Sequence, residues 1–307
     1  MTLSPSQGLV AVIVLNWNRR EDTLACLRSL GRLDYPELLL LLVDNGSTDG
    51  TSEAVRRDFP GVEVLQLEAN LGFADGNNAG IRRALELGAD YVLVLNNDVE
   101  VDPASVTELV AEARTRPGAG ALTPKILYFE PPDLIWFAGA SFDPRSGYNG
   151  RQRGYRERDD GRFDQVVETD RVCGAAMLVP RPVLEQVGVF DGELFAYSED
   201  TDWSLRARAA GYRLYVVPAS KVWHKISVSS GGESSPTTLY YGLRNTIAVC
   251  ERHAPLGPVG TWRRRLVLVV AHVVQALLSD RKREGLAAVA EGWRDLRAGR
   301  FGQRSSR

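Results

Sequence analysis

Residues 38–50 read LLLLLVDNGSTDG, an apolar run followed at once by a polar turn. The six apolar residues 38–43 are typical of a parallel strand that is covered on both faces. Asp44 follows them directly, and the turn over residues 45–50 leads into a predicted helix. Because open α/β sheets bind ligands at the carboxyl ends of their strands, this stretch predicts a buried strand that brings a carboxylate to a binding edge.

Strands and helices alternate on both sides of this stretch. Apolar runs predict the strands, and apolar residues at helical spacing predict the helices between them. The predicted strands are residues 9–15, 38–43, 62–67 and 91–95, and the predicted helices are residues 20–30, 51–58, 74–87 and 103–114. This order predicts an α/β fold with a mostly parallel central sheet and helices on both faces.

The pattern changes after the fourth helix. Residues 131–170 are rich in Pro, Gly, Asp and Arg, which predicts hairpins and loops. Further strands are predicted at residues 119–127, 172–179 and 212–217, and further helices at residues 180–187 and 200–210. Beyond Thr237 we expect helices only, with a break at residues 255–260. The predicted division is a main domain over residues 1–235 and a C-terminal helical region over residues 236–307.

The chain has 307 residues, of which 44% are hydrophobic, enough for one large domain and an appendage. Its formal net charge is −2, which gives no indication of a nucleic-acid partner. The charge is uneven: residues 251–307 contain twelve Lys or Arg and five Asp or Glu, a net +7, which leaves −9 for the rest. A basic tail beside an acidic body indicates contact with an anionic surface such as lipid.

The three cysteines, Cys26, Cys173 and Cys250, are far apart and lack metal-ligand spacing. We therefore expect reduced thiols in a cytoplasmic protein. The first eight residues are polar and do not resemble a signal peptide. The longest apolar stretch, residues 266–278, is thirteen residues long, whereas a membrane-spanning helix needs about twenty. No transmembrane segment is expected.

Asp44 and the turn after it are a candidate nucleotide site. A carboxylate at a strand end can accept hydrogen bonds from a nucleobase or a ribose, and the backbone N–H groups at a helix start are free to bind a ligand. The alternative is an ordinary turn in which Ser47 or Asp49 caps the following helix.

A second polar pair, Asn77 and Asn78, lies on the predicted helix over residues 74–87. Gly76 and Gly80 fall on one face of that helix. Either the glycines let the helix pack closely on the sheet, or the asparagines lie near a bound nucleotide. The sequence leaves both explanations open.

Three polar residues, Asn96, Asn97 and Asp98, follow the strand over residues 91–95. Mg²⁺ and Mn²⁺ prefer oxygen ligands and are often held by one or two carboxylates together with phosphate oxygens. Asp98 suits this role, with Asn96 assisting. The same residues would also suit a solvated turn that caps the next helix.

Glu199, Asp200 and Asp202, followed by Trp203, open a predicted helix. Acidic residues are favoured at a helix start by capping and by the helix dipole, so one explanation is structural. The other is that Asp200 is a general base, because a carboxylate near a metal-bound diphosphate can take the proton of an attacking hydroxyl. His224, directly after an apolar strand, is a candidate third metal ligand.

Together these motifs resemble the inverting family 2 glycosyltransferases of the GT-A fold, especially the rhamnosyltransferase-like members of bacterial surface-polysaccharide pathways. The likeness extends over about residues 9–250. It rests on Asn16, Trp17, Asn18, Asp44, Asn96, Asn97, Asp98, Glu199, Asp200 and His224. One position departs from the family pattern: the first acid of the DxD metal motif is Asn96 here, which puts more of the metal binding on Asp98 and His224.

The resemblance implies a role for these positions. The expected donor-binding residues are Asn16, Trp17, Asn18, Asp44 and Asn97, with Asn77 added from its helix; the expected ligands of Mg²⁺ or Mn²⁺ are Asp98, Asn96 and His224; the expected base is Asp200, adjoined by Glu199, Asp202 and Trp203. The implied donor is dTDP-rhamnose, with a UDP-sugar such as UDP-galactofuranose next. The implied acceptor is a glycan or a lipid-linked sugar, and the addition of a single sugar is expected because no QxxRW sequence is present.

Two other functions are weighed against this one. A nucleotidyltransferase normally has a Gly-rich basic loop after the first strand, whereas residues 16–20 contain no glycine. A catalytically silent scaffold could bind a sugar nucleotide or a partner enzyme, but the joint presence of Asp98, Asp200 and His224 argues against it.

The tail contains a basic amphipathic segment. Trp262, Arg263, Arg264 and Arg265 precede its apolar run, and a second basic cluster follows at residues 281–283. Such helices often lie in a membrane interface, so we expect peripheral association with the inner face of the plasma membrane. The alternative is that the helix packs on the main domain or in a homodimer.

Overall fold

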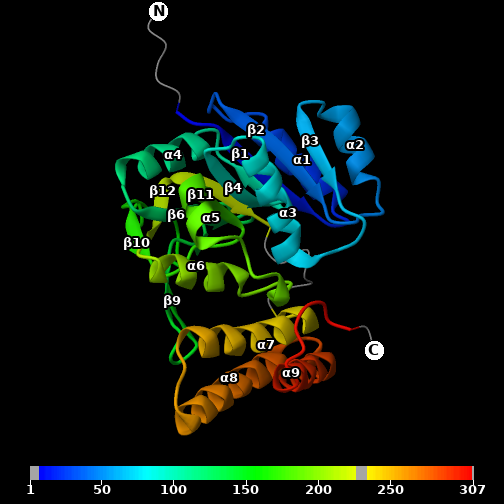
Figure 1. Ribbon diagram of the computed structural model, residues 1–307, viewed down its shortest axis with the longest axis vertical. Helices are drawn as coiled ribbons and strands as arrows, with labels where there is room; N and C mark the ends of the chain where they lie inside the picture. Colours follow the sequence, from blue (N-terminus) through cyan, green and yellow to red (C-terminus); the bar gives the residue numbers. More distant parts are fainter. Residues whose placement is uncertain (1–6, 226–233, 306–307) are drawn as a thin grey trace, which may run out of the picture.

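The computed structural model describes residues 7–225 and 234–305. Its centre is a ten-stranded sheet with helices on both faces, and three C-terminal helices lie together below the sheet in the view of Figure 1. The α/β fold expected from the sequence is confirmed.

The first half of the sheet is parallel. Its strands are β1 (Val10–Asn16), β2 (Leu38–Asp44), β3 (Val62–Gln66) and β4 (Tyr91–Asn96), in the spatial order β4-β1-β2-β3. All of them occur within two residues of the predicted bounds. The register places Asn16 beside Asp44 and Leu15 beside Asn96. The polar residues at the ends of these strands therefore meet at one edge of the sheet.

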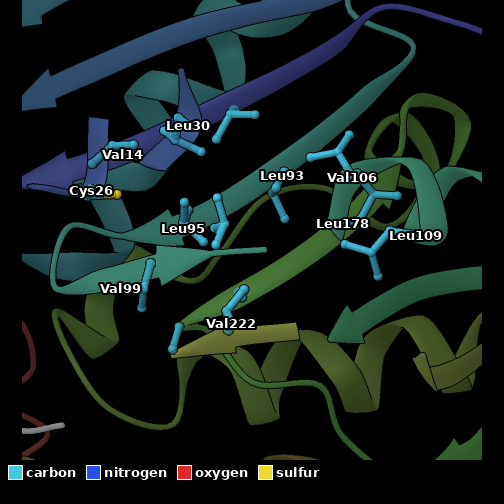
Figure 2. Packing of buried hydrophobic residues seen from close by; sticks show 14 of the residues in the cluster. Val14, Cys26, Leu30, Leu93, Leu95, Val99, Val106, Leu109, Leu178 and Val222 are labelled. Carbon is cyan, nitrogen blue, oxygen red and sulfur yellow. The ribbon is translucent and has the colours of Figure 1, made fainter. Parts of the chain in front are cut away.

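Helices cover both faces of this half. They are α1 (Arg20–Leu30), α2 (Thr51–Asp58), α3 (Gly72–Glu86) and α4 (Ser105–Thr115). Alternate residues of a strand point to opposite faces. Val12 and Val14 of β1 accordingly belong to one core cluster with residues of α1, α2 and α4, whereas Ile13 belongs to another with residues of α3. Figure 2 shows Val14 in the first cluster with Leu30 of α1 and Val106 of α4.

The second half of the sheet is mixed. Its strands are β5 (Val99–Val101), β6 (Ala119–Tyr128), β7 (Ile135–Phe137), β10 (Val167–Thr169), β11 (Ala176–Pro180) and β12 (Arg213–His224), while β8 (Ala140–Asp143) and β9 (Tyr148–Gln152) form a separate hairpin. β11 lies antiparallel between β4 and β6. The sequence did not predict β5, and β12 continues to His224 instead of ending at residue 217. The end of β12 pairs with β5 on one side and with the end of β6 on the other.

The remaining helices are α5 (Arg181–Val187), α6 (Glu199–Ala209), α7 (Pro236–His253), α8 (Pro258–Leu278) and α9 (Lys282–Arg297), together with a short 3₁₀ helix, η1 (Gly192–Leu194). As expected, α7 and α8 are separated by a break containing Pro255. The last three helices share a core of their own. None of the helices in the described ranges is long and apolar enough to cross a lipid bilayer.

The glycines of α3 allow this helix to lie close to the sheet. A Cβ atom on Gly80 would lie 2.6 Å from Cγ2 of Ile13 and 2.8 Å from Cγ2 of Val43. A Cβ atom on Gly76 would lie 2.7 Å from Cδ1 of Leu15. The close-packing explanation of these two glycines is therefore confirmed.

Gly80→Val should lower the free energy of unfolding by about 3 kcal/mol, because its side chain must displace two well-packed residues of β1 and β2. Denaturant unfolding measures the loss. Gly61→Val is the matched control, since a Cβ atom there meets nothing within 4 Å. Equal effects of the two substitutions would contradict the close contact.

Candidate functional site

A network centred on the Asn16 side chain joins the loops at the sheet edge. Asn16 is fully buried, and its Oδ1 accepts hydrogen bonds from the Arg19 backbone (3.2 Å), Thr23 Oγ1 (2.9 Å) and Asn97 Nδ2 (3.1 Å). Its own Nδ2 donates to Ser47 Oγ at 3.0 Å. The Asn97 amide also donates to Thr23 Oγ1 at 2.9 Å. Because these polar atoms are engaged with one another, the structure supports a positioning role for Asn16 and Asn97.

The loop after β2 is held in a similar way. Asp44 is 1% exposed; its Oδ1 accepts from the Ser47 backbone at 3.0 Å and its Oδ2 from the Ser52 hydroxyl. The Asn18 side chain accepts from the Thr48 backbone at 2.8 Å and so links the loops after β1 and β2. Both oxygens of the Asp44 carboxylate are thus bonded to residues of the loop and helix that follow it.

Trp17 and Asn77 are placed very differently. Trp17 is 50% exposed in the loop after β1, so its ring is accessible to a ligand. Asn77 is fully buried in α3 and donates from Nδ2 to the Phe73 carbonyl at 2.9 Å. Its Oδ1 is buried without a hydrogen-bond partner among the described residues. Asn78 instead fixes the Phe190 backbone through both atoms of its amide.

Asp98 and His224 form a buried pair. Oδ1 of Asp98 lies 3.0 Å from Nε2 of His224, although 126 residues separate them in the chain. The Asn96 amide nitrogen lies 3.4 Å from the same Nε2, and the Trp136 ring packs edge-on against the imidazole at 4.9 Å. Burial alone would raise the pKa of Asp98, but the hydrogen bond with His224 and smaller contributions, including the Arg19 charge, hold that pKa below its ordinary value.

This pair has the chemistry of a two-ligand metal site. Across residues 7–225 and 234–305, no three His, Cys, Asp or Glu side chains converge to hold an ion. Asp98 Oδ1 and His224 Nε2 are hydrogen-bonded at 3.0 Å, so the two side chains present an oxygen and a nitrogen ligand at one point. A carboxylate and an imidazole fit Mg²⁺ or Mn²⁺, with phosphate oxygens and water as the remaining ligands, whereas Asn96 turns its amide nitrogen toward His224 and would ligate only through its oxygen.

Glu199 and Asp200 differ in ionisation. Asp200 is half-buried, and its carboxylate accepts from the backbone of Gly174 at 3.0 Å and of Thr201 at 2.6 Å. Glu199 is buried, and its Oε2 has no hydrogen-bond partner in the described part of the chain. Burial, reinforced by the Asp200 charge, raises the pKa of Glu199 from 4.5 to about 8. Glu199 is therefore largely protonated at neutral pH.

A short segment before β11 joins this pair to the metal candidate. Gly174 donates its N–H to Asp200, and the carbonyl of Ala175 accepts from the Asn96 backbone at 2.9 Å. Two hydrogen bonds to adjacent residues thus connect the Asp200 carboxylate with the end of β4. The acidic motif and the strand-end motif consequently belong to one site.

The backbone that leads to Glu199 and Asp200 is strained. Phe195, Tyr197 and Ser198 have φ angles of 63°, 67° and 69°, in the left-handed region that side chains disfavour. Asn245 of α7 holds this segment, because its Nδ2 lies 2.8 Å from each of the carbonyl oxygens of Leu194, Ala196 and Tyr197. Sequence reasoning missed Asn245; its one signal is that it is a polar residue on an otherwise apolar helix face.

Asp202 and Trp203 serve the architecture. Asp202 is fully buried and bonds to Arg206 (2.8 Å), Arg252 (3.0 Å) and His253 (2.8 Å), which fastens α6 to α7. Burial opposes ionisation, but the hydrogen bonds from His253 and Arg206 lower the pKa of Asp202 to about 2. Trp203 lies in the core at 1% exposure and donates to the Gly188 carbonyl at 2.8 Å.

Comparison with known proteins adds three findings. The family model described as "Glycosyl transferase family 2" matches residues 11–188. The chain is 31% identical over 259 residues to the N-acetylglucosaminyl-diphospho-decaprenol L-rhamnosyltransferase of Mycobacterium tuberculosis, covering 78% of this chain and 82% of the other. It is 26% identical over 262 residues to the dTDP-rhamnosyl transferase RfbF of Shigella flexneri, covering 80% and 82%.

Among solved structures, the mannosyltransferase PcManGT from Pyrobaculum calidifontis, in complex with GDP-Man and Mn²⁺, matches with a TM-score of 0.59. The match has 17% sequence identity and covers 96% of this chain and 76% of the other. At this identity the likeness shows a shared fold, which is the GT-A fold.

Glu199→Gln should make the protein more stable at neutral pH by about 2–3 kcal/mol. An acid whose pKa is raised by folding lowers stability once the unfolded chain ionises. Wild-type stability should therefore fall as the pH rises from about 4.5 to about 8, and the Gln variant should lack this fall. Denaturant unfolding across this pH range measures it, with Glu193→Gln as the exposed control. Parallel curves for wild type and Glu199→Gln would show that Glu199 is ionised in the folded protein.

Proposed function

Because the chain belongs to glycosyl transferase family 2, we propose that it is an inverting, metal-dependent glycosyltransferase that moves a single sugar to a hydroxyl group. The observation that carries this proposal is the junction at Gly174 and Ala175, which ties the Asp200 carboxylate to the strand end bearing Asp98. A candidate base and a candidate metal ligand are thereby tied to the same stretch of backbone. Rhamnose from dTDP-rhamnose is the favoured donor, since both relatives described above are named for rhamnosyl transfer.

Asp200 is the general base of the proposed reaction. Its carboxylate is oriented by the backbone N–H groups of Gly174 and Thr201. It takes the proton of the acceptor hydroxyl, whose oxygen forms a bond to the anomeric carbon. The bond between that carbon and the β-phosphate oxygen breaks, and the nucleoside diphosphate leaves from the opposite face with the electron pair. One displacement of this kind inverts the anomeric configuration.

Asp98, His224 and Asn96 would hold Mg²⁺ or Mn²⁺ in this proposal. The cation supplies charge neutralisation for the diphosphate, so that no general acid is needed on the leaving group. The protein contributes a carboxylate that stays ionised, because the pKa of Asp98 lies below its ordinary value. Trp136 restricts the His224 ring by edge-on packing.

The names of the relatives suggest a class of acceptor as well as a donor. The relative of 31% identity is named for transfer to N-acetylglucosaminyl-diphospho-decaprenol, so a polyprenyl-diphosphate sugar is the acceptor class that we propose. A UDP-sugar such as UDP-galactofuranose is the alternative donor. The silent scaffold is the alternative function, and any catalysed release of nucleoside diphosphate would exclude it.

A lipid-linked acceptor calls for a membrane-facing surface, and α8 offers one. Eight large apolar side chains of this helix are between 46% and 81% exposed. They are Val259, Trp262, Leu266, Val267, Val270, Val274, Leu277 and Leu278. Their spacing of three or four residues forms a continuous stripe along a helix about 31 Å long. The opposite side of α8 packs on the C-terminal core through Leu268 and Ala276.

Of the three arginines before the apolar run, two bond to other protein groups and one is exposed to solvent. Arg264 is buried and donates to the carbonyls of Pro144 and Ala254, and Arg265 pairs with Glu251 at 2.6 Å. Arg263 is exposed, as are residues 281–283 beyond the helix. An apolar stripe with exposed cations near both ends matches an anionic bilayer surface, and we propose that α8 lies in this interface.

Asp200→Asn should lower the rate of sugar transfer at least a hundredfold, while the donor still binds. Thermal shift with dTDP-rhamnose, UDP-galactofuranose, UDP-galactose and GDP-mannose, each with Mg²⁺ or EDTA, identifies the donor. Release of nucleoside diphosphate in the presence of a polyprenyl-diphosphate N-acetylglucosamine measures transfer. Glu199→Gln is the matched control and should remain active, because Glu199 is already neutral at pH 7. Normal turnover by Asp200→Asn would rule out its role as base.

Leu266→Glu with Val270→Glu should weaken binding to phosphatidylglycerol vesicles at least tenfold, because two charges enter the apolar stripe. Ala287→Glu with Ala290→Glu, on the exposed side of α9, is the control. Vesicle co-sedimentation and light scattering are measured together. If wild type ignores vesicles and forms a dimer that the α8 variant disrupts, the stripe is a dimer interface instead.

A further inference from the structure

Two cationic side chains from distant parts of the chain converge beside the Asp98–His224 pair. Arg19 lies in the loop between β1 and α1, and Lys225 follows β12 directly. Nη2 of Arg19 lies 3.0 Å from one carboxylate oxygen of Asp22, and Nζ of Lys225 lies 3.0 Å from the other. One carboxylate therefore faces two positive charges, and the cluster keeps a net charge of +1.

Backbone contacts hold this cluster against the strand-end motif. Lys225 donates its N–H to the carbonyl oxygen of Asp98 at 2.9 Å. Arg19 donates its backbone N–H to Asn16 Oδ1 at 3.2 Å, and Asn16 is bonded in turn to Asn97. The backbones of Arg19 and Lys225 are thus both attached to the loops that carry the strand-end motif.

The cations have unused capacity for an anion. The guanidinium of arginine presents five N–H groups, and Nε of Arg19 is buried without an acceptor among the described residues. The side chains of Arg19 and Lys225 are 27% and 25% exposed, so a ligand can reach them. Planar guanidinium groups bind phosphate oxygens in pairs, and an ammonium group binds them as a point charge.

The summed charge of the four residues around this cluster, with a bound divalent cation, would balance the charge of a diphosphate. Arg19, Lys225, Asp22 and Asp98 together sum to zero, so a divalent cation on Asp98 would bring the group to +2. A sugar nucleotide carries two negative charges on its diphosphate. An acid in place of Asn96 would lower the local sum by one. The departure from the DxD pattern and the cation cluster therefore act in the same direction.

We propose that Arg19 and Lys225 are a diphosphate-binding subsite, and that Asp22 holds both side chains in place until the donor arrives. The donor's phosphate oxygens then take over hydrogen bonds that Asp22 accepts in the free protein. This inference rests on the proposed function and names the protein charges that recognise its donor. It also predicts that part of the affinity for the diphosphate persists without a metal ion.

Calorimetric titration in EDTA tests the subsite with dTDP, dTMP and thymidine, or with the uridine series if that binds wild type more tightly. Arg19→Met and Lys225→Met should each weaken dTDP binding about tenfold or more, because each removes a charge-assisted hydrogen bond. Thymidine binding should be unchanged. Asp22→Asn should instead tighten dTDP binding severalfold, since it removes the competing carboxylate. Arg28→Met, on the exposed end of α1, is the control.

The outcomes separate this inference from the proposed function. If no nucleotide binds to the wild-type protein with or without Mg²⁺, the proposed function fails. If dTDP binds to wild type and equally to Arg19→Met and Lys225→Met, the subsite alone is wrong. If Asp22→Asn loses dTDP binding as Lys225→Met does, the three residues form a structural ion cluster, and the subsite is again wrong.

Discussion

The buried amide of Asn16 is the constraint on which the rest of the site depends. Its four hydrogen bonds connect the loop after β1, the start of α1, the loop after β2 and the residues that follow β4. Leaving a buried amide unpaired costs about 1–3 kcal/mol, so all of these segments must adopt their positions together. The network fixes the backbone of Arg19 directly and that of Asp98 through its neighbour Asn97. Asn16, predicted to bind the donor, also holds its neighbouring loops in place.

The parallel half of the sheet supplies only part of the site. Its strands bring Asp44 and Asn96 to one edge, but the partner of Asp98 comes from β12, whose end pairs with β5. Asp200 comes from α6, and the strained segment before it is held by Asn245 of α7. The C-terminal helices therefore take part in shaping the site, in addition to offering the apolar surface of α8.

The buried acidic residues near the site differ in whether they are ionised at neutral pH. Burial, reinforced by the neighbouring Asp200 charge, leaves Glu199 protonated at neutral pH. Asp98 and Asp202 are also buried, yet hydrogen bonds keep the pKa of each below its ordinary value. Asp98 faces a candidate metal position, whereas Asp202 joins two helices. Burial thus keeps a carboxyl group neutral where hydrogen-bond donors are lacking, as at Glu199, and partners keep it ionised where they are present, as at Asp98 and Asp202.

The sequence by itself determined the alternation of strands and helices, the binding edge, and Asp98 and Asp200 as candidates, because apolar periodicity records which faces are buried and parallel strands end at a common edge. Only the tertiary structure decided the rest. β5 has three residues and no periodicity of its own, so it exists through its pairing with β12. Trp203 donates to the Gly188 carbonyl, and Asn245 donates to the carbonyl of Tyr197 in the strained loop. These partners lie outside the local sequence of each residue, so the local sequence could not predict either placement. The periodicity of apolar residues reports which faces are buried, but it does not report which distant residues a polar side chain will bond.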